Sequence, residues 1–189
     1  MEGEARRARR SRAGGRAGPT LAASALGALA AGTLVLRHHP VWGGLVALVA
    51  AVALVWGWFF AHESGDPRSH LAAMLADPVF DTSLLGAIAW AERTGRPGVS
   101  ALALVCLGLT YVASYERARS DALGYRTFEG LGYRVVRAAL IVAGLVSGQR
   151  AVALGLLAAV SAVAVAVRAA NVAVQERRPS GAGRQRGPR

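Results

Sequence analysis

Two aspartates of this 189-residue chain have the residue type and the spacing needed for metal-assisted chemistry. Asp77 and Asp81 stand in the stretch ADPVFD, and a helix would place both carboxylates on one face, about one turn apart. Carboxylates at this spacing are suited to hold a divalent cation beside a diphosphate. A structural interpretation stays open as well, because Asp77 before Pro78 is a natural helix N-cap and the helix dipole favours Asp81.

A second group of candidate residues is basic. The segment SYERARSDALGYRTFEGLGYR, residues 114–134, carries Arg117 and Arg119, and the basic group continues with Arg126, Arg134 and Arg137. Guanidinium groups bind phosphate oxygens in a bidentate manner, which favours a phosphate site. The same cluster would serve equally well to orient the chain and to bind lipid headgroups, so both interpretations stay open.

Long apolar segments must position these side chains. Hydrophobic residues make up 53% of the chain and come in unbroken blocks instead of the stripes of a soluble domain. At a rise of ~1.5 Å per residue, segments of about 17 to 23 residues cross a membrane as helices. We predict an all-α polytopic membrane protein of about six transmembrane helices. The predicted spans are 20–36, 42–60, 74–91, 98–115, 132–148 and 151–173, of which the fifth is the weakest.

Polar connections between these spans complete the predicted arrangement. Residues 61–70 are predicted to form a loop before the third span. Arg134 and Arg137, near the start of the fifth span, are predicted to run along the helix so that their guanidinium groups reach the lipid headgroups. Trp58, close to the end of the second span, is assigned to an interfacial aromatic belt.

The distribution of arginine predicts the orientation. All 22 basic residues are arginine, and a cytoplasmic N-terminus places eighteen of them inside and only four, Arg37, Arg93, Arg96 and Arg150, outside. We therefore predict cytoplasmic N- and C-termini. Because the arginines lie at the ends of apolar segments instead of on one folded face, the net charge of +11 does not indicate a nucleic-acid partner.

Three regions follow from this pattern. Residues 1–18 are predicted to form a disordered Arg-rich cytoplasmic arm, residues 19–174 a six-helix transmembrane domain, and residues 175–189 a disordered basic tail, with both tails lying over anionic membrane lipids. The abundance of Ala, Val, Leu, Gly and Arg is typical of a GC-rich bacterial genome. The predicted location is therefore a bacterial plasma membrane.

The six spans, DPVFD at the opening of the third helix and SYERARSDALG after the fourth resemble the CDP-alcohol phosphatidyltransferases, in particular the bacterial phosphatidylinositol-phosphate synthases. The resemblance covers about residues 18–173. It implies a cytoplasmic site that transfers a phosphatidyl group from a CDP-lipid to a small alcohol and releases CMP. Phospholipid biosynthesis would be the setting, and Mg²⁺ or Mn²⁺ the cofactor.

The resemblance also assigns roles to individual residues. The family motif places four aspartates around two divalent metals, and Asp77 and Asp81 correspond to the third and the fourth. The fourth is taken as the base that activates the acceptor hydroxyl, which would be the role of Asp81. Arg117 and Arg119 fall in the S-Y-x-x-A-R stretch, together with Tyr115, and would bind the phosphate of the acceptor.

The first half of the family motif has no counterpart. The second span ends VWGWFFAHESG, and no acidic residue lies between Glu4 and Glu63. Two carboxylates are enough for one ion but not for a pair of them. The sequence therefore leaves open an active transferase and a catalytically degenerate family member that binds lipid or pairs with a partner, as a homodimer or a heterodimer. An unrelated small membrane protein is the third possibility.

Overall fold

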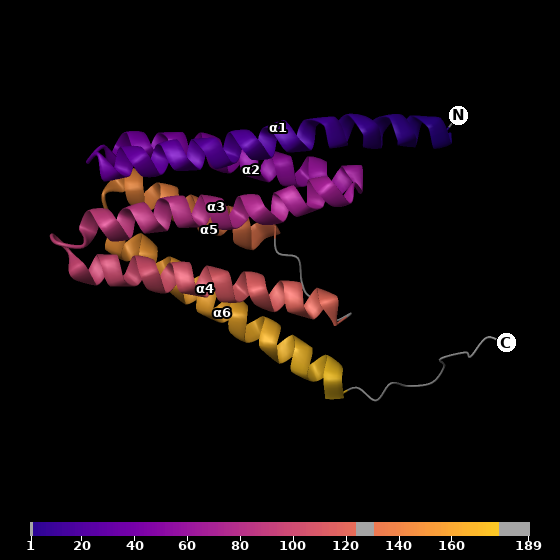
Figure 1. Cartoon of the computed structure of the whole chain (residues 1–189). Coiled ribbons are helices and arrows are strands. Elements are labelled where there is room, and N and C mark those ends of the chain that lie inside the picture. Colours follow the sequence, from indigo (N-terminus) through magenta and orange to yellow (C-terminus); the bar gives the residue numbers. More distant parts are fainter. Residues whose placement is uncertain (1, 124–130, 178–189) are drawn as a thin grey trace.

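The computed structural model describes residues 2–123 and 131–177 of the chain (Figure 1). The described residues are helical, with short connections and no strands. The helices are α1 (Glu2–Leu36), α2 (Pro40–Ser64), α3 (Pro67–Glu92), α4 (Pro97–Ala122), α5 (Leu131–Ser147) and α6 (Arg150–Arg177).

Five of the helices in the described ranges, α1, α2, α3, α4 and α6, are long and apolar enough to cross a membrane. The exception is α5, which has only 17 residues and is the shortest of the six helices described. The prediction of a polytopic all-helical membrane protein is confirmed. α5 corresponds to the fifth predicted span, which is the weakest of the six in the sequence.

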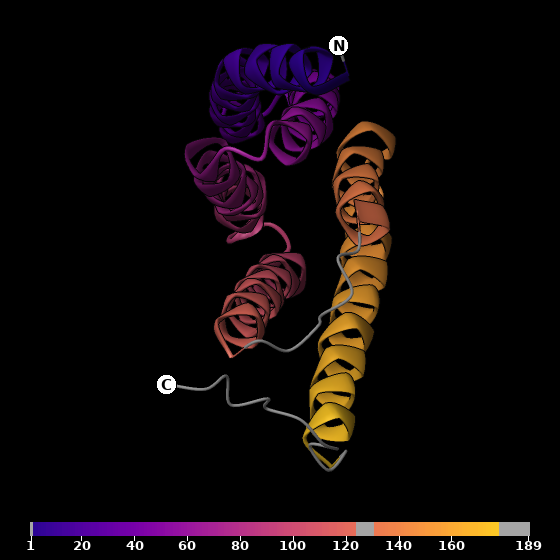
Figure 2. The ribbon, with the colours of Figure 1, turned by 90° about the vertical axis from the view of Figure 1, so that its right-hand side faces the viewer.

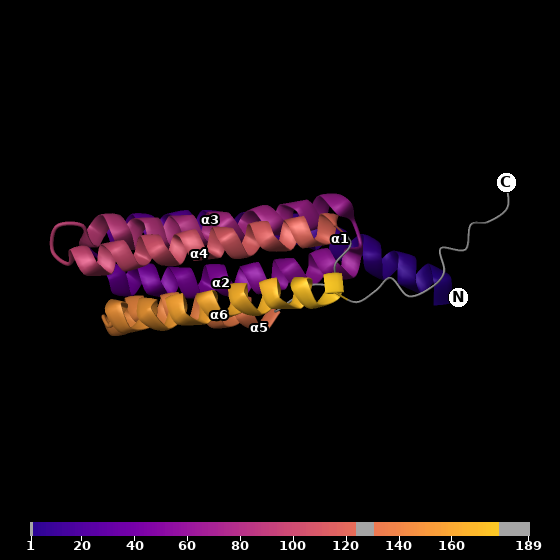
Figure 3. The same ribbon diagram turned by 90° about the horizontal axis from the view of Figure 1, so that it is seen from below.

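The helices run side by side along one common direction (Figures 1 and 3). α1 packs against α2 and α3, α4 packs against α3 and α6, and α5 packs against α2 and α6. Seen along the bundle, α3 and α4 continue from the α1–α2 pair on one side, and α5 and α6 lie on the other (Figure 2). We call the end at which α1, α3 and α5 begin and α2, α4 and α6 end the basic end, and the opposite end the far end.

α3 begins earlier in the chain than its predicted span, which starts at residue 74. α3 begins at Pro67, with Asp66 as its N-cap, whose carboxylate accepts a hydrogen bond of 3.1 Å from the backbone N–H of Ser69. α2 continues to Ser64, so that most of the predicted loop 61–70 is helical. Asp77 therefore lies within the helix, and the interpretation of Asp77 as an N-cap is wrong. Asp66–Pro67 offers the same cap chemistry eleven residues earlier.

α1 extends beyond its predicted span. The backbone is helical from Glu2, where a disordered arm over residues 1–18 is predicted. Ala and Arg, which dominate this segment, are strong helix formers, and extension of an existing helix avoids the cost of nucleation. At the other terminus, α6 reaches Arg177, and residues 178–189 of the predicted tail lie outside the described residues.

The far end is held by an ion pair. Glu92, the last residue of α3, is buried and pairs with Arg150 at the start of α6, and Arg96 lies 4.0 Å from the same carboxylate. Arg96 and Arg150 are two of the four arginines predicted on the outer side. These contacts join α3 to α6, which are not sequence neighbours.

Candidate functional site

Asp77 and Asp81 lie on one face of α3, as their spacing predicts, and both are buried, with 5% and 3% of their surface exposed. Asp77 is ten residues into α3, about 15 Å from its start at 1.5 Å per residue. A carboxylate at such depth in a membrane-spanning helix is costly unless it meets a partner of opposite charge. The two aspartates therefore require cations from a neighbouring helix.

Two arginines of α5 supply these cations. Nη1 of Arg134 lies 2.6 Å from Oδ2 of Asp77, and Nη1 of Arg137 lies 3.1 Å from Oδ2 of Asp81. Arg137 also reaches Oδ1 of Asp77, at 3.7 Å. Both arginines are buried. We call these four residues the Asp–Arg cluster.

The Asp–Arg cluster corrects the prediction for α5. Arg134 and Arg137 are predicted to extend toward the headgroups, but they turn into the bundle. The i,i+3 spacing of the arginines and the i,i+4 spacing of the aspartates are the sequence signal for this pairing, because each pair lies on one face of its own helix. That signal identifies a charged face on each helix but not the helix that lies opposite.

Aromatic rings cover the outer sides of both guanidinium groups. The guanidinium carbon of Arg134 lies 4.0 Å from the ring centre of Trp58, and that of Arg137 lies 5.7 Å from the ring of Tyr133. Trp58 is 8% exposed, so its assignment to an interfacial belt is wrong. The Tyr133 hydroxyl donates a hydrogen bond of 3.0 Å to Ser161 of α6. The rings hold the arginines in place by packing and by cation–π attraction.

A cavity of about 240 Å³, which we call the polar cavity after its three charged lining residues, adjoins the Asp–Arg cluster at the basic end. Asp77, Arg117 and Arg134 line it, so that α3, α4 and α5 each contribute a charged side chain. The remaining lining residues are Met74, Ser114 and Ala118. The structure thus brings together two of the predicted site residues, Asp77 and Arg117, with Arg134.

Arg119 lies elsewhere. It lines a separate cavity of about 330 Å³ between α4 and α6, together with Tyr115, Glu116 and Arg168. Residues two apart on a helix point about 200° away from each other, so Arg117 and Arg119 cannot face one site. The two arginines that the sequence groups as one phosphate site are divided between two cavities.

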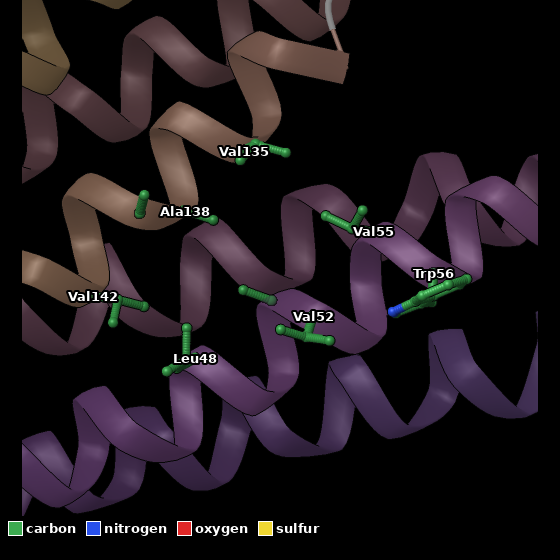
Figure 4. A pocket seen from close by; sticks show the side chains of 9 residues that line it. Leu48, Val52, Val55, Trp56, Val135, Ala138 and Val142 are labelled. Carbon is green, nitrogen blue, oxygen red and sulfur yellow. The ribbon is translucent and has the colours of Figure 1, made fainter.

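An apolar groove of about 300 Å³ runs between α2 and α5 (Figure 4). Leu48, Val52 and Trp56 of α2 and Val135 and Val142 of α5 line it, and the figure shows which side chains of the two helices contribute to this lining. Val135 directly follows Arg134 in the sequence. The groove and the Asp–Arg cluster therefore both involve the first turns of α5.

The described residues do not fit a pair of divalent cations. No group of three His, Cys, Asp or Glu side chains that could hold a metal exists within residues 2–123 and 131–177. Asp77 and Asp81 are the acids of the site, and guanidinium groups already bind both. A metal ion between them would meet two fixed positive charges and too few carboxylates to offset them.

Among known proteins, the phosphatidylinositol phosphate synthase of Mycobacteroides abscessus is 30% identical to this chain over 131 residues. The match covers 67% of this chain and 60% of the synthase, so the chain spans less than two thirds of that relative. No family model matches the chain. The similarity supports a relationship to the CDP-alcohol phosphatidyltransferases and a multi-pass membrane protein connected with phospholipid biosynthesis.

Proposed function

We propose that this chain is a divergent CDP-alcohol phosphatidyltransferase-like protein that binds the phosphate-bearing headgroup of a membrane lipid in the polar cavity. The charge of that cavity carries the proposal. The Asp–Arg cluster is balanced, with two carboxylates and two guanidinium groups, and Arg117 adds a positive charge on the opposite wall. Arg117 is partly buried, and a guanidinium that lines a cavity attracts phosphate oxygens.

The apolar groove supports a lipid as the ligand. A diacyl lipid has a charged headgroup joined to apolar chains, and α5 contributes Arg134 to the lining of the polar cavity and Val135 to that of the apolar groove. An acyl chain in the groove would replace contacts with bulk lipid by contacts with Leu48, Val52 and Val142. The similarity to a phosphatidylinositol phosphate synthase agrees with a phospholipid ligand.

Binding without transfer is the form of this function that the geometry favours. The resemblance gives Asp81 the role of base and gives both aspartates the role of metal ligands, but Arg137 and Arg134 hold these carboxylates. We therefore propose the degenerate alternative, in which the protein binds a CDP-lipid or a related phospholipid at the cytoplasmic face of a bacterial plasma membrane. An active transferase is the competing proposal.

Equilibrium binding of CDP-diacylglycerol to the purified protein tests this function. Arg117→Gln should weaken binding at least about tenfold, because a hydrogen bond to a charged group contributes roughly 1.5–3 kcal/mol. Arg119→Gln is the matched control, since Arg119 lies on the same helix but lines the other cavity. Equal affinities of the two variants and the wild type would contradict the proposal.

A CMP-release assay on the same preparations distinguishes binding from transfer. With CDP-diacylglycerol, inositol phosphate and Mg²⁺ present, we expect no CMP above the background of protein-free vesicles. CMP release that disappears in Asp81→Asn would replace the binding function with the transferase function. Lipid binding and CMP release are measured separately, so each proposal fails on its own result.

A further inference from the structure

The Asp–Arg cluster joins α3 to α5 through buried ion pairs. α5 packs its backbone against α2 and α6, and α3 packs against α1, α2 and α4. Arg134 and Arg137 nevertheless reach across to Asp77 and Asp81 with distances of 2.6 Å and 3.1 Å. Long side chains thus fill the space between α3 and α5.

The fixed positions of the guanidinium groups distinguish this cluster from a mobile ion pair. All four side chains are at most 7% exposed, and the ring of Trp58 lies behind Arg134. Arg137 contacts both carboxylates, at 3.1 Å and 3.7 Å, as a single ion bridging two acids would. The charges of the four residues cancel.

We propose that Arg134 and Arg137 are the resident cations of this site: their guanidinium groups take the place of a divalent cation between Asp77 and Asp81. The protein therefore binds no divalent cation there, and the counter-charge of the aspartates is part of the chain. A second cation would have to displace a guanidinium that already pairs with a buried carboxylate and packs against an aromatic ring. This inference depends on the ion pairs and not on lipid binding.

Manganese binding, measured by the loss of the electron paramagnetic resonance signal of free Mn²⁺, tests the inference on the full chain in nanodiscs. The wild type should bind no Mn²⁺ that depends on Asp77, and Arg119→Gln, outside the cluster, should behave in the same way. The double variant Arg134→Gln with Arg137→Gln should bind Mn²⁺, because both carboxylates then face the site without a partner charge. Adding Asp77→Asn to that variant should remove the binding.

Two results overturn the inference. Stoichiometric Mn²⁺ binding by the wild type that is lost in Asp77→Asn would show that the aspartates hold a metal despite the arginines. Absence of binding in a folded double-arginine variant would show that the arginines are not what excludes the ion. Failure of CDP-diacylglycerol binding would leave both measurements unchanged, so the two proposals are separable.

A thermal-unfolding cycle decides the case if the double-arginine variant does not fold. Asp77→Asn and Arg134→Gln should each lower the melting temperature, because each removes one side of a buried ion pair. The variant that carries both changes should lose clearly less than the sum of the two single losses. Additive losses would show that the two residues are not coupled, which overturns the inference.

Discussion

At the scale of single residues, Trp58 connects the Asp–Arg cluster to the surface of the basic end. Its indole packs against Arg134, and the rings of His62 and His70 lie at centroid distances of 6.0 Å and 5.8 Å from it. His62 is exposed and His70 is partly buried, whereas Trp58 is buried. Trp58 therefore separates the guanidinium of Arg134 from the solvent-facing histidines.

Substitution of Trp58 should show that the ring itself is required. Trp58→Ala should lower the free energy of unfolding by about 3–5 kcal/mol, since it leaves a cavity beside a buried cation. Trp58→Phe should be tolerated, because it keeps an aromatic face and removes an indole N–H that is buried without a hydrogen-bond partner among the described residues. Denaturant unfolding in micelles measures both effects, and equal losses in the two variants would contradict the role of the ring.

The sequence predicts the aspartates of the site but not their partners. A spacing of four residues is enough to place Asp77 and Asp81 on one helical face, which the structure confirms. The direction of a long arginine side chain depends on which groups the neighbouring helix presents to it. Arg134 turns inward because α5 lies where this side chain can reach Asp77 of α3. The same limitation explains the incorrect assignment of Trp58, since a tryptophan near a span end is suited to either environment.

At the scale of helices, close approach depends on a few glycines of α1 and α2. A Cβ at Gly32 of α1 would lie 2.5 Å from the backbone oxygen of Ser83 in α3, and one at Gly43 of α2 would lie 2.9 Å from the backbone oxygen of Ala31. Small residues allow membrane helices to approach in this way. Because α3 carries the aspartates, its contact with α1 also fixes the site.

Gly32→Ala should separate α1 from α3. The added methyl group meets backbone, which cannot move out of the way, and overpacking of this kind costs about 1–3 kcal/mol. Gly86→Ala is the matched control, because a Cβ at Gly86 would meet nothing within 4 Å in the described part of the chain. The melting temperature should fall for Gly32→Ala and stay unchanged or rise for Gly86→Ala, and a similar fall in both would refute the role of the contact.

The helices are predicted better in their interiors than at their ends. Unbroken apolar runs give each predicted span a counterpart among α1 to α6. The start of α3 is predicted incorrectly because Asp66–Pro67 and Asp77–Pro78 carry the same capping signal, and only the first is used. Pro78 is accommodated inside α3, whereas the N-cap interpretation of Asp77 would place the start of a helix there.

At the scale of the whole molecule, the two ends of the bundle have different electrostatic roles. The basic end contains the polar cavity and the approach to the Asp–Arg cluster, whereas the far end is closed by the ion pair of Glu92 with Arg150. The start of α1 and the end of α6 lie at the same end (Figures 1 and 3). This arrangement agrees with an even number of crossings, and the excess of arginine predicts that the basic end faces the cytoplasm.

Labelling with a membrane-impermeant maleimide tests this orientation. The chain has one cysteine, Cys106, which is buried, so that Cys106→Ser provides a background without a reactive thiol. In that background, Gly95→Cys at the far end should react in intact cells, and Arg68→Cys at the basic end should react only after permeabilisation. Both positions are exposed. The reverse pattern would place the polar cavity outside the cell.

The attachment of Arg134 and Arg137 to the chain has a practical consequence. Carboxylates that rely on dissolved ions lose their counter-charge when a chelator such as EDTA removes those ions, but a guanidinium group stays bound to its side chain and keeps its proton. The bundle should therefore survive extraction in EDTA and growth of the cell under magnesium starvation, because its buried acids take nothing from the surrounding solution.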